Sequence, residues 1–290
     1  MTLCVSWIRR AGRTKELMLA ADSLLNGGGD FMEAPKIFPL KRGDCAIACA
    51  GDTAYTFPIV THILQSIDLN VKSRTRAQDF VELVHYFEEL MNSCLATVIN
   101  PVTDKDKGPD FQMLFVGYSA KLKDFKMVVF QYDKSRKIMK RRTEKTLKKN
   151  KVAVIGDKGA SKKGETNLVS LYRRELFLRL EADGIGDSGC IDMQPLDVLN
   201  KFIRNSKYRT VSGHLQMLKI CDFMSVLPYA IMEDNNPESI YYMGRKLMNY
   251  ETFPYPIYNI AEHDVFYMKE TKEEFKRSEQ EIAKLSQFAK

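Results

Sequence analysis

The chain has 290 residues, 44% of them hydrophobic, which is enough to bury one large core or two modest ones. It contains no run of about 18 apolar residues and no signal-peptide pattern, so we expect no transmembrane helix and a cytoplasmic location. Six cysteines form no CxxC pair and only four histidines are present, which predicts reduced thiols and neither disulfides nor a metal site.

The net charge of +7 is concentrated in one stretch, DKSRKIMKRRTEKTLKKNK, at residues 133–151. This stretch stands between two apolar, strand-like runs, so we expect it to extend a hairpin into solvent. Lysines at such positions keep edge strands from pairing with other chains. No aromatic residues that could stack on bases are interleaved with its basic ones. Nucleic-acid binding through this stretch is therefore a less favoured alternative.

The first predicted elements are strands. Short apolar runs at 2–8 and 16–21 flank the turn-like RRAGRTK, a pattern that predicts a hairpin. After a glycine-rich connection come KIFPL at 36–40 and CAIACAG at 45–51. The second of these is apolar on both faces, which predicts a strand covered on both sides.

Two helices are predicted next. Apolar residues recur at helical spacing over 53–67, which indicates the first helix. The second is expected to open at Thr75, because Gln78 stands three positions later as in a capping box, and to run to Ile99. The polar segment NPVTDKDKGPD then predicts an exposed loop.

The second half of the chain again groups strands with strands and helices with helices. We expect strands at 111–119, 125–133 and 152–157, helices at 165–180 and 195–205, and a strand at 214–220. This order is typical of an α+β fold rather than a doubly wound sheet. Two antiparallel sheets stacked face to face, with a helical layer outside each, would bury every apolar face. The expected architecture is therefore a four-layer αββα sandwich.

A single main domain is expected over residues 1–260. No linker rich in Pro, Gly or Ser divides this part of the chain, and no internal repeat is found in it. Residues 261–290 are expected to form a charged helical extension. The apolar positions of that extension give only a narrow stripe, which could pack on a partner or on the main domain.

Four short motifs stand in a fixed order: MT at the start, LAADS at 19–23, KIFPL at 36–40 and AIACAGD at 46–52. Together they resemble the proteasome β-subunit group of N-terminal-nucleophile (Ntn) hydrolases, including its bacterial relatives. The later segments VAVIGDKGA and TVSGHLQMLKI resemble two further turns of the family. The resemblance is clear over about the first seventy residues and implies the four-layer Ntn-hydrolase fold.

The resemblance also implies a catalytic site. Removal of Met1 would expose Thr2, whose hydroxyl would attack a peptide or amide carbonyl with its own α-amine as the base. Asp22 and Lys36 would flank this nucleophile, and the amide of Gly51 would contribute to the oxyanion hole. Taken singly, each of these residues has an ordinary structural interpretation, and only the joint pattern points to a site.

The chemistry of these residue types supports the same roles. A threonine hydroxyl needs an adjacent base, and a free α-amine with a pKa of about 7.7 to 8 is partly neutral near pH 7. The ammonium of Lys36 would disfavour protonation of that amine, and Asp22 would hold Lys36 charged and oriented. Gly51 has no Cβ, so its amide can approach a developing oxyanion closely.

Several positions depart from the family pattern. Asp157 stands where the family has a serine that positions the amine, and its charge would favour the protonated amine. Ser212 matches a later serine of the family, but Arg209 replaces the aspartate usual three positions before it, and His214 replaces a glycine. These changes weaken the support around the amine. The alternative to an active hydrolase is therefore a catalytically impaired assembly or binding protein with the same fold.

The resemblance finally implies partners. Peptide or protein substrates are expected, and so is self-assembly into a ring or an open helical arrangement that encloses the active sites. An ATP-dependent unfoldase would be a suitable partner for such an assembly. No metal or organic cofactor and no membrane partner is expected.

Overall fold

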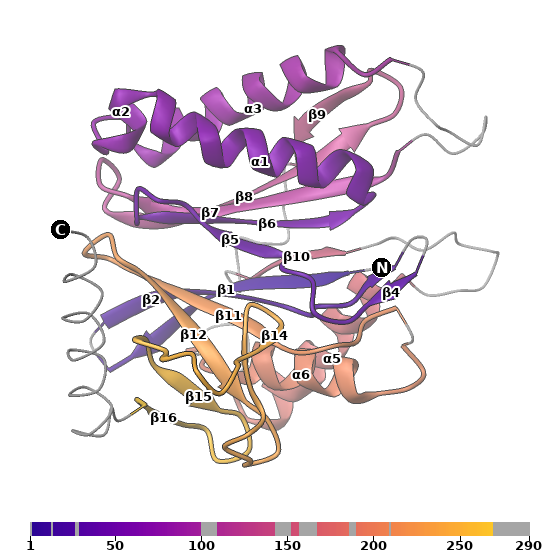
Figure 1. Ribbon diagram of the computed structural model, residues 1–290, viewed down its shortest axis with the longest axis vertical. Coiled ribbons are helices and arrows are strands. Elements are labelled where there is room, and N and C mark those ends of the chain that lie inside the picture. The colour runs from indigo at the N-terminus through magenta and orange to yellow at the C-terminus, as the bar shows by residue number, and fades with distance from the viewer. Residues whose placement is uncertain are drawn as a thin grey trace, which may run out of the picture.

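The computed structural model describes residues 2–12, 14–26, 29–99, 109–142, 152–156, 167–185, 190–208 and 210–268. The described chain combines helices with two large, mainly antiparallel sheets, which confirms the expected mixture of helices and antiparallel sheets. Figure 1 shows the two sheets facing each other, with helices on the outer side of each.

The nine-stranded sheet contains the N-terminus of the described chain. Its main path runs in the order β10, β1, β2, β11, β12, β13, β14, and β15 joins β12 and carries β16. These strands are β1 Leu3–Ala11, β2 Thr14–Ala21, β10 Val152–Gly156, β11 Gln216–Cys221, β12 Val226–Met232, β13 Ile240–Tyr242, β14 Arg245–Lys246, β15 Ile257–Asn259 and β16 Asp264–Phe266. The pairing of β12 with β15 is parallel, which departs from the purely antiparallel expectation.

The five-stranded sheet follows chain order. Its strands are β5 Ile37–Pro39, β6 Cys45–Gly51, β7 Phe111–Ser119, β8 Asp124–Asp133 and β9 Ile138–Arg141, each antiparallel to the next. A small separate hairpin, β3 Leu25–Asn26 with β4 Asp30–Phe31, precedes this sheet. The basic stretch does not extend a hairpin between the two apolar runs that flank it, because β10 pairs with β1 in the other sheet; its residues 138–141 instead form β9, which pairs with β8. Residues 143–151 lie outside the described part of the chain.

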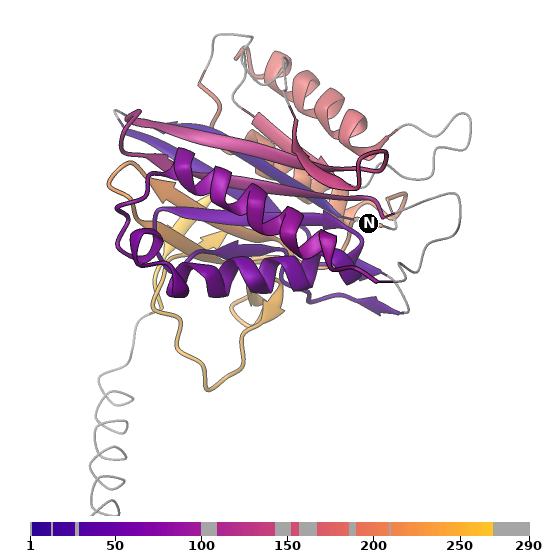
Figure 2. The same ribbon diagram turned by 90° about the horizontal axis from the view of Figure 1, so that it is seen from above.

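Five helices are described, and they fall into two groups. They are α1 Thr53–Leu69, α2 Val71–Arg74, α3 Phe80–Ala96, α5 Leu168–Ala182 and α6 Gln194–Arg204. Seen from above, α1 and α3 run side by side across the five-stranded sheet (Figure 2). The helices α5 and α6 pack on the nine-stranded sheet instead.

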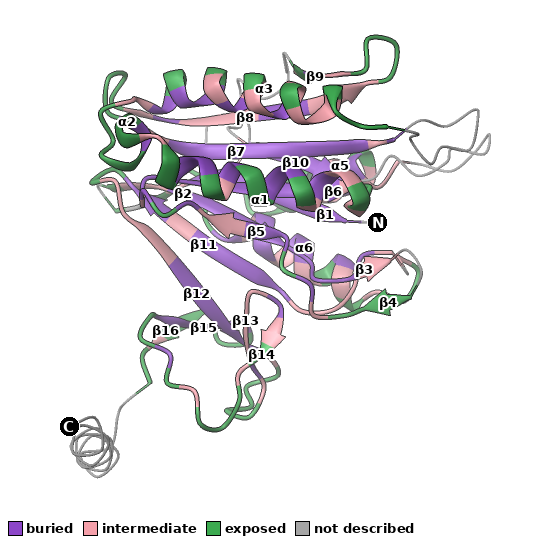
Figure 3. Cartoon of the chain, turned by 45° about the horizontal axis from the view of Figure 1, so that its top comes forward, coloured by how far each residue is buried: buried purple, intermediate pink, exposed green. Residues whose placement is uncertain are grey.

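The strand sequences explain how the layers pack. In β6 the short side chains of Ala46, Ala48 and Ala50 lie in the core between the two sheets, whereas the alternate residues Cys45 and Ile47 pack toward α1 and α3. The strand is therefore covered on both faces, as its sequence predicts. Figure 3 shows this burial along the central strands, with exposed residues on the outer faces of the helices.

The beginning of α3 differs from the prediction. The helix starts at Phe80 with Asp79 as its N-cap, and Thr75 instead ends the short α2. Arg76 adopts a left-handed backbone conformation, with φ of 63°, which interrupts any continuous helix from Thr75. The side chain of Gln78 accepts a hydrogen bond from the Ser73 hydroxyl, so the expected capping box is not formed.

The C-terminal part of the domain contains strands that the sequence analysis did not assign. The strands from β12 to β16 have only two to seven residues each, and several are separated by polar turns with left-handed residues such as Asp234 and Asn235. Runs this short give little periodicity. Because β16 pairs with β15, the nine-stranded sheet continues past residue 260, the domain boundary that the sequence predicts. Residues 269–290 of the expected extension lie outside the described residues.

No described helix has the length and apolar character needed to cross a bilayer.

Asp79 connects α3 to the turn between β7 and β8. Its carboxylate accepts hydrogen bonds from the Val81 amide at 3.1 Å, the Ser119 hydroxyl at 2.8 Å and the Lys121 amide at 3.1 Å. Partial burial acts to raise the pKa of this carboxyl, but these hydrogen bonds outweigh it and hold the pKa of Asp79 below its ordinary value.

Replacing Asp79 with alanine is expected to lower the free energy of unfolding by about 1–2 kcal/mol at pH 7. A depressed pKa in the folded state stabilises the protein above the pKa of the unfolded state, about 3.9. The difference in the free energy of unfolding between wild type and Asp79→Ala should therefore shrink as the pH falls from 6 toward the pKa of Asp79 in the folded state. Urea unfolding at several pH values measures this. Asp68→Ala, which breaks only an exposed pair with Lys41, should show no such trend.

Candidate active site

A buried pair of opposite charges lies where the end of β2 meets the segment leading into β5. The Nζ of Lys36 is 2.8 Å from Oδ2 of Asp22, and the two side chains are only 2% and 0% exposed. Buried charges persist in proteins when they are paired and hydrogen-bonded, and this pair meets both conditions. The structure thus brings together two of the predicted site residues.

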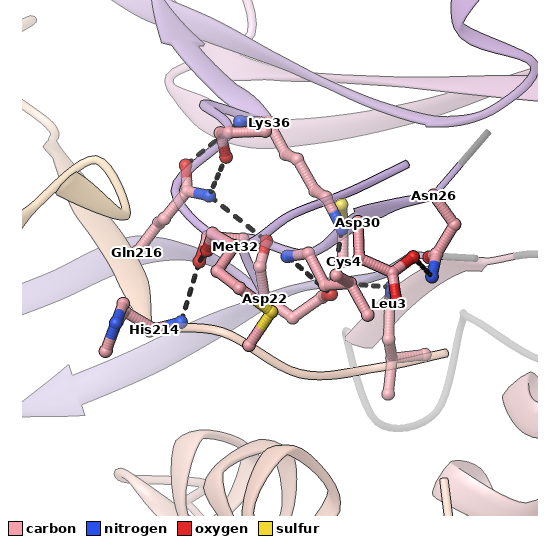
Figure 4. A network of polar contacts seen from close by, with 12 residues as sticks. Leu3, Cys4, Asp22, Asn26, Asp30, Met32, Lys36, His214 and Gln216 are labelled. Atoms are coloured by element: carbon pink, nitrogen blue, oxygen red, sulfur yellow. Dashed lines mark hydrogen bonds and ion pairs between the residues drawn. The ribbon is translucent and has the colours of Figure 1, made fainter. Parts of the chain in front are cut away.

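The carboxylate of Asp22 also fixes the start of β1. Its Oδ1 accepts the Leu3 amide at 2.9 Å, and its Oδ2 accepts the Leu24 amide at 3.3 Å. Leu3 directly follows Thr2, so the same carboxylate that holds the Lys36 ammonium is bonded to the residue next to Thr2. Figure 4 shows Lys36, Asp22 and Leu3 gathered in one network.

Thr2 itself is 6% exposed and lies beside β10. In the β1–β10 pairing, Leu3 stands opposite Gly156. A Cβ at Gly156 would lie 2.8 Å from the backbone oxygen of Thr2, a distance that real Cβ contacts essentially never show. Glycine at this position therefore lets β10 approach the start of β1 closely.

Gly51 ends β6 near the same place. Its φ of 105° lies in the range that favours glycine, and a Cβ there would overlap the Asp110 backbone oxygen. Two residues earlier, the Cys49 amide donates to the Lys36 carbonyl at 3.2 Å. This contact places the end of β6 beside the Lys36 segment. Close packing against Asp110 therefore favours glycine at position 51, in addition to the oxyanion role that the resemblance implies.

A side chain links the two sheets at this end of the molecule. Gln112 on β7 stands opposite Ala50 on β6, and its Nε2 donates to the Gly156 carbonyl at 3.4 Å. Since Gly156 pairs with Leu3, the end of β6 and the start of β1 converge here. The structure thus gathers the elements that carry Thr2, Asp22, Lys36 and Gly51.

Ser212 reaches the site through its backbone. Its carbonyl accepts the Ser23 amide at 3.3 Å and the Leu24 amide at 3.0 Å, the two residues that follow Asp22. Asp157 and Arg209, together with Met1, lie outside the described residues, so the roles predicted for them stay predictions.

Two buried polar residues of this network were missed by the sequence analysis. Ser23 is fully buried, and its hydroxyl donates to the Met32 carbonyl and accepts the His214 amide at 2.7 Å. Gln216, at the start of β11, is fully buried as well. The available signal was a single amide side chain in the strand run HLQMLKI, and the family resemblance of this segment assigns no role to that side chain.

A neighbouring thiol is not a competing nucleophile. Burial raises the pKa of Cys49 to about 12, although the nearby Lys36 ammonium and a hydrogen bond with Thr56 act to lower it. The thiol is therefore protonated at neutral pH, and thiolate is the reactive form of cysteine. Within the described ranges, no cluster of three or more His, Cys, Asp or Glu side chains could hold a metal ion.

Comparisons with known proteins give matches among solved structures. No family model matches the chain, and no curated protein matches it. Among solved structures, the Anbu (Gly-1) mutant from Hyphomicrobium sp. strain MC1 is similar at 12% sequence identity and a TM-score of 0.47. The match covers 78% of this chain and 84% of that one. A likeness this distant indicates neither the activity nor the substrate of the chain.

Proposed function

We propose that the chain is a proteasome-like threonine hydrolase of the Ntn type, which cleaves peptide or amide bonds with Thr2 as nucleophile after removal of Met1. The observation that carries this proposal is the buried Lys36–Asp22 pair, whose carboxylate also accepts the amide of Leu3. The pair is thereby attached to the residue that follows the proposed nucleophile.

The energetics of buried charges support a functional role for the pair. Replacing a buried ion pair by well-packed apolar residues is often neutral or stabilising, so such a pair is a weak device for stability alone. An ammonium next to an α-amine, in contrast, has a direct chemical use. It disfavours protonation of the amine and so leaves more of it neutral at pH 7 to act as a base.

The proposed reaction has two steps. In the first, Oγ1 of Thr2 attacks the substrate carbonyl carbon while its proton passes to the α-amine of Thr2, directly or through a water. The C–N bond then breaks, the proton moves to the leaving amine, and an ester joins the acyl group to Thr2. In the second step, water attacks that ester with the same amine as base, which releases a carboxylic acid and restores the hydroxyl.

The remaining residues would assist these steps. The Gly51 amide would donate to the oxyanion of each tetrahedral intermediate. Asp22 would keep Lys36 charged and oriented through their 2.8 Å contact. Two stacked sheets between outer helices support the assignment of the chain to the four-layer Ntn-hydrolase fold. By analogy with that fold, the working form would be a homo-oligomer that encloses its sites, served by an ATP-dependent unfoldase.

The proposal predicts that activity requires a free α-amine on Thr2. A chain carrying an uncleavable N-terminal extension should fold as the wild type does and lose hydrolysis of fluorogenic peptide amides. The expected loss is at least about 10³-fold, because nucleophile and base act as a unit. Circular dichroism and urea unfolding serve as the controls for folding.

Two results would contradict the proposal. If the extended chain were as active as the processed one, the α-amine of Thr2 would not be the base. If the processed wild type cleaved no member of a broad peptide-amide library, the impaired assembly or binding protein would replace the hydrolase.

A further inference from the structure

Gln216 makes three hydrogen bonds to the backbone around the charged pair. Its Oε1 accepts the Lys36 amide at 3.0 Å, and its Nε2 donates to the Asp22 carbonyl at 3.1 Å and to the Ala34 carbonyl at 2.8 Å. A glutamine side chain offers two donors and an acceptor oxygen, so both hydrogens and the oxygen are in use. Figure 4 shows the amide between Lys36 and Asp22.

Two of these bonds, to Lys36 and Ala34, reach from the nine-stranded sheet to the segment that leads into the five-stranded sheet. Gln216 pairs with Ala21 in the nine-stranded sheet, whereas Lys36 leads directly into β5 of the five-stranded sheet. A single fully buried side chain therefore sets how the backbone of Asp22 lies relative to that of Lys36. Without it, three backbone groups would lose their partners in the interior, which is unfavourable.

We propose that Gln216 is a positioning residue, which holds the Lys36 ammonium beside Thr2 by fixing the backbones of Asp22 and Lys36 across the two sheets. This inference rests on the proposed threonine hydrolase. A lysine side chain is a flexible four-carbon stem, so its ammonium is well placed only when its backbone and its counter-ion are both fixed. Gln216 fixes the backbone, and the Asp22 carboxylate supplies the fixed counter-ion.

The neutrality of the amide matters for this role. A glutamate at the same position would bring a second negative charge close to the pair and would compete with Asp22 for the ammonium. The amide makes the same cross-sheet connection without changing the local charge. It is also confined by its surroundings, since a Cβ at Gly244 would lie 3.2 Å from its Nε2.

The test measures the rate at which a peptide β-lactone acylates Thr2, as a function of pH, at a temperature where every variant is folded. Gln216→Met keeps the length of the side chain and removes all three hydrogen bonds. We expect acylation to slow by about 10- to 100-fold, because a misplaced catalytic group has effects of this size. The apparent pKa of the reaction should rise, since a displaced ammonium no longer disfavours protonation of the amine.

Asn259→Leu is the matched control. Asn259 is also a buried amide with three hydrogen bonds, to Asn235, Ala261 and Glu262, and it lies on β15 in the same sheet. Its replacement should lower stability to a similar degree and leave the pH profile as in the wild type. A merely structural role of Gln216 would make the two variants behave alike.

A second variant keeps the test decisive if Gln216→Met does not fold. Gln216→Glu retains an acceptor for the Lys36 amide and adds a negative charge, so it should raise the apparent pKa as well. A wild-type pH profile in whichever of these variants folds would overturn the positioning role while leaving the hydrolase intact. A wild-type chain that is not acylated at all would instead overturn the proposed function, and the positioning role with it.

Discussion

Replacing Lys36 with methionine is expected to lower the free energy of unfolding by about 3–5 kcal/mol, because Asp22 is then left charged and uncompensated in the interior. Both side chains are at most 2% exposed, so solvent cannot screen the lost interaction. Urea unfolding at pH 7 measures the change. Lys41→Met removes a lysine whose pair with Asp68 is exposed, and it should change stability by at most about 1 kcal/mol.

The double variant Lys36→Met with Asp22→Asn separates the charge from the packing. An asparagine oxygen can still accept the Leu3 amide that Asp22 Oδ1 accepts at 2.9 Å, and neither charge of this pair remains. We therefore expect the double variant to be more stable than Lys36→Met alone, although neither should hydrolyse substrate at the wild-type rate. A double variant less stable than the single one would show that the orphaned charge is not the cause of the loss.

Replacing Thr2 with alanine is expected to reduce hydrolysis of peptide amides by at least about 10³-fold, because the nucleophile is removed while the α-amine stays. Only the hydroxyl and one methyl group are lost, and the Leu3 amide keeps its bond to Asp22, so the urea midpoint should change little. Steady-state hydrolysis by the purified, processed chain provides the measurement. Thr2→Ser, which keeps the hydroxyl and loses the methyl group, should retain measurable activity.

The two substitutions at Thr2 separate chemistry from folding. An alanine variant as active as the wild type would exclude Thr2 as the nucleophile. A serine variant as inactive as the alanine variant, yet folded, would indicate that the hydroxyl is not what the reaction requires.

Much of the fold could be predicted from local patterns. The runs that form β1, β2, β6 and β7 have clear apolar patterns with turn residues between them, and α1 begins at the predicted residue. The start of α3 could not be predicted in the same way. Arg76 adopts a left-handed conformation, and the bonds of Asp79 to Ser119 and Lys121 join segments some forty residues apart.

The site shows the same division between sequence pattern and tertiary structure. Asp22 and Lys36 stand in motifs that can be recognised in the sequence, and the structure joins them in one ion pair. Gln216 lies in TVSGHLQMLKI, but the resemblance of that segment assigns it no role, and its importance arises only where the two sheets meet around that pair. The positions of Asp157 and Arg209 lie outside the described residues, so whether they weaken the site is a question for kinetics.

The most direct test of the central claim is the intact mass of the purified chain before and after incubation with a peptide β-lactone. We predict a chain that lacks Met1 and gains one acyl group, which peptide mapping locates on Thr2, while Thr2→Ala gains none. A chain that lacks Met1 and gains no acyl group, or gains it at another residue, would contradict the assignment of Thr2 as the catalytic nucleophile.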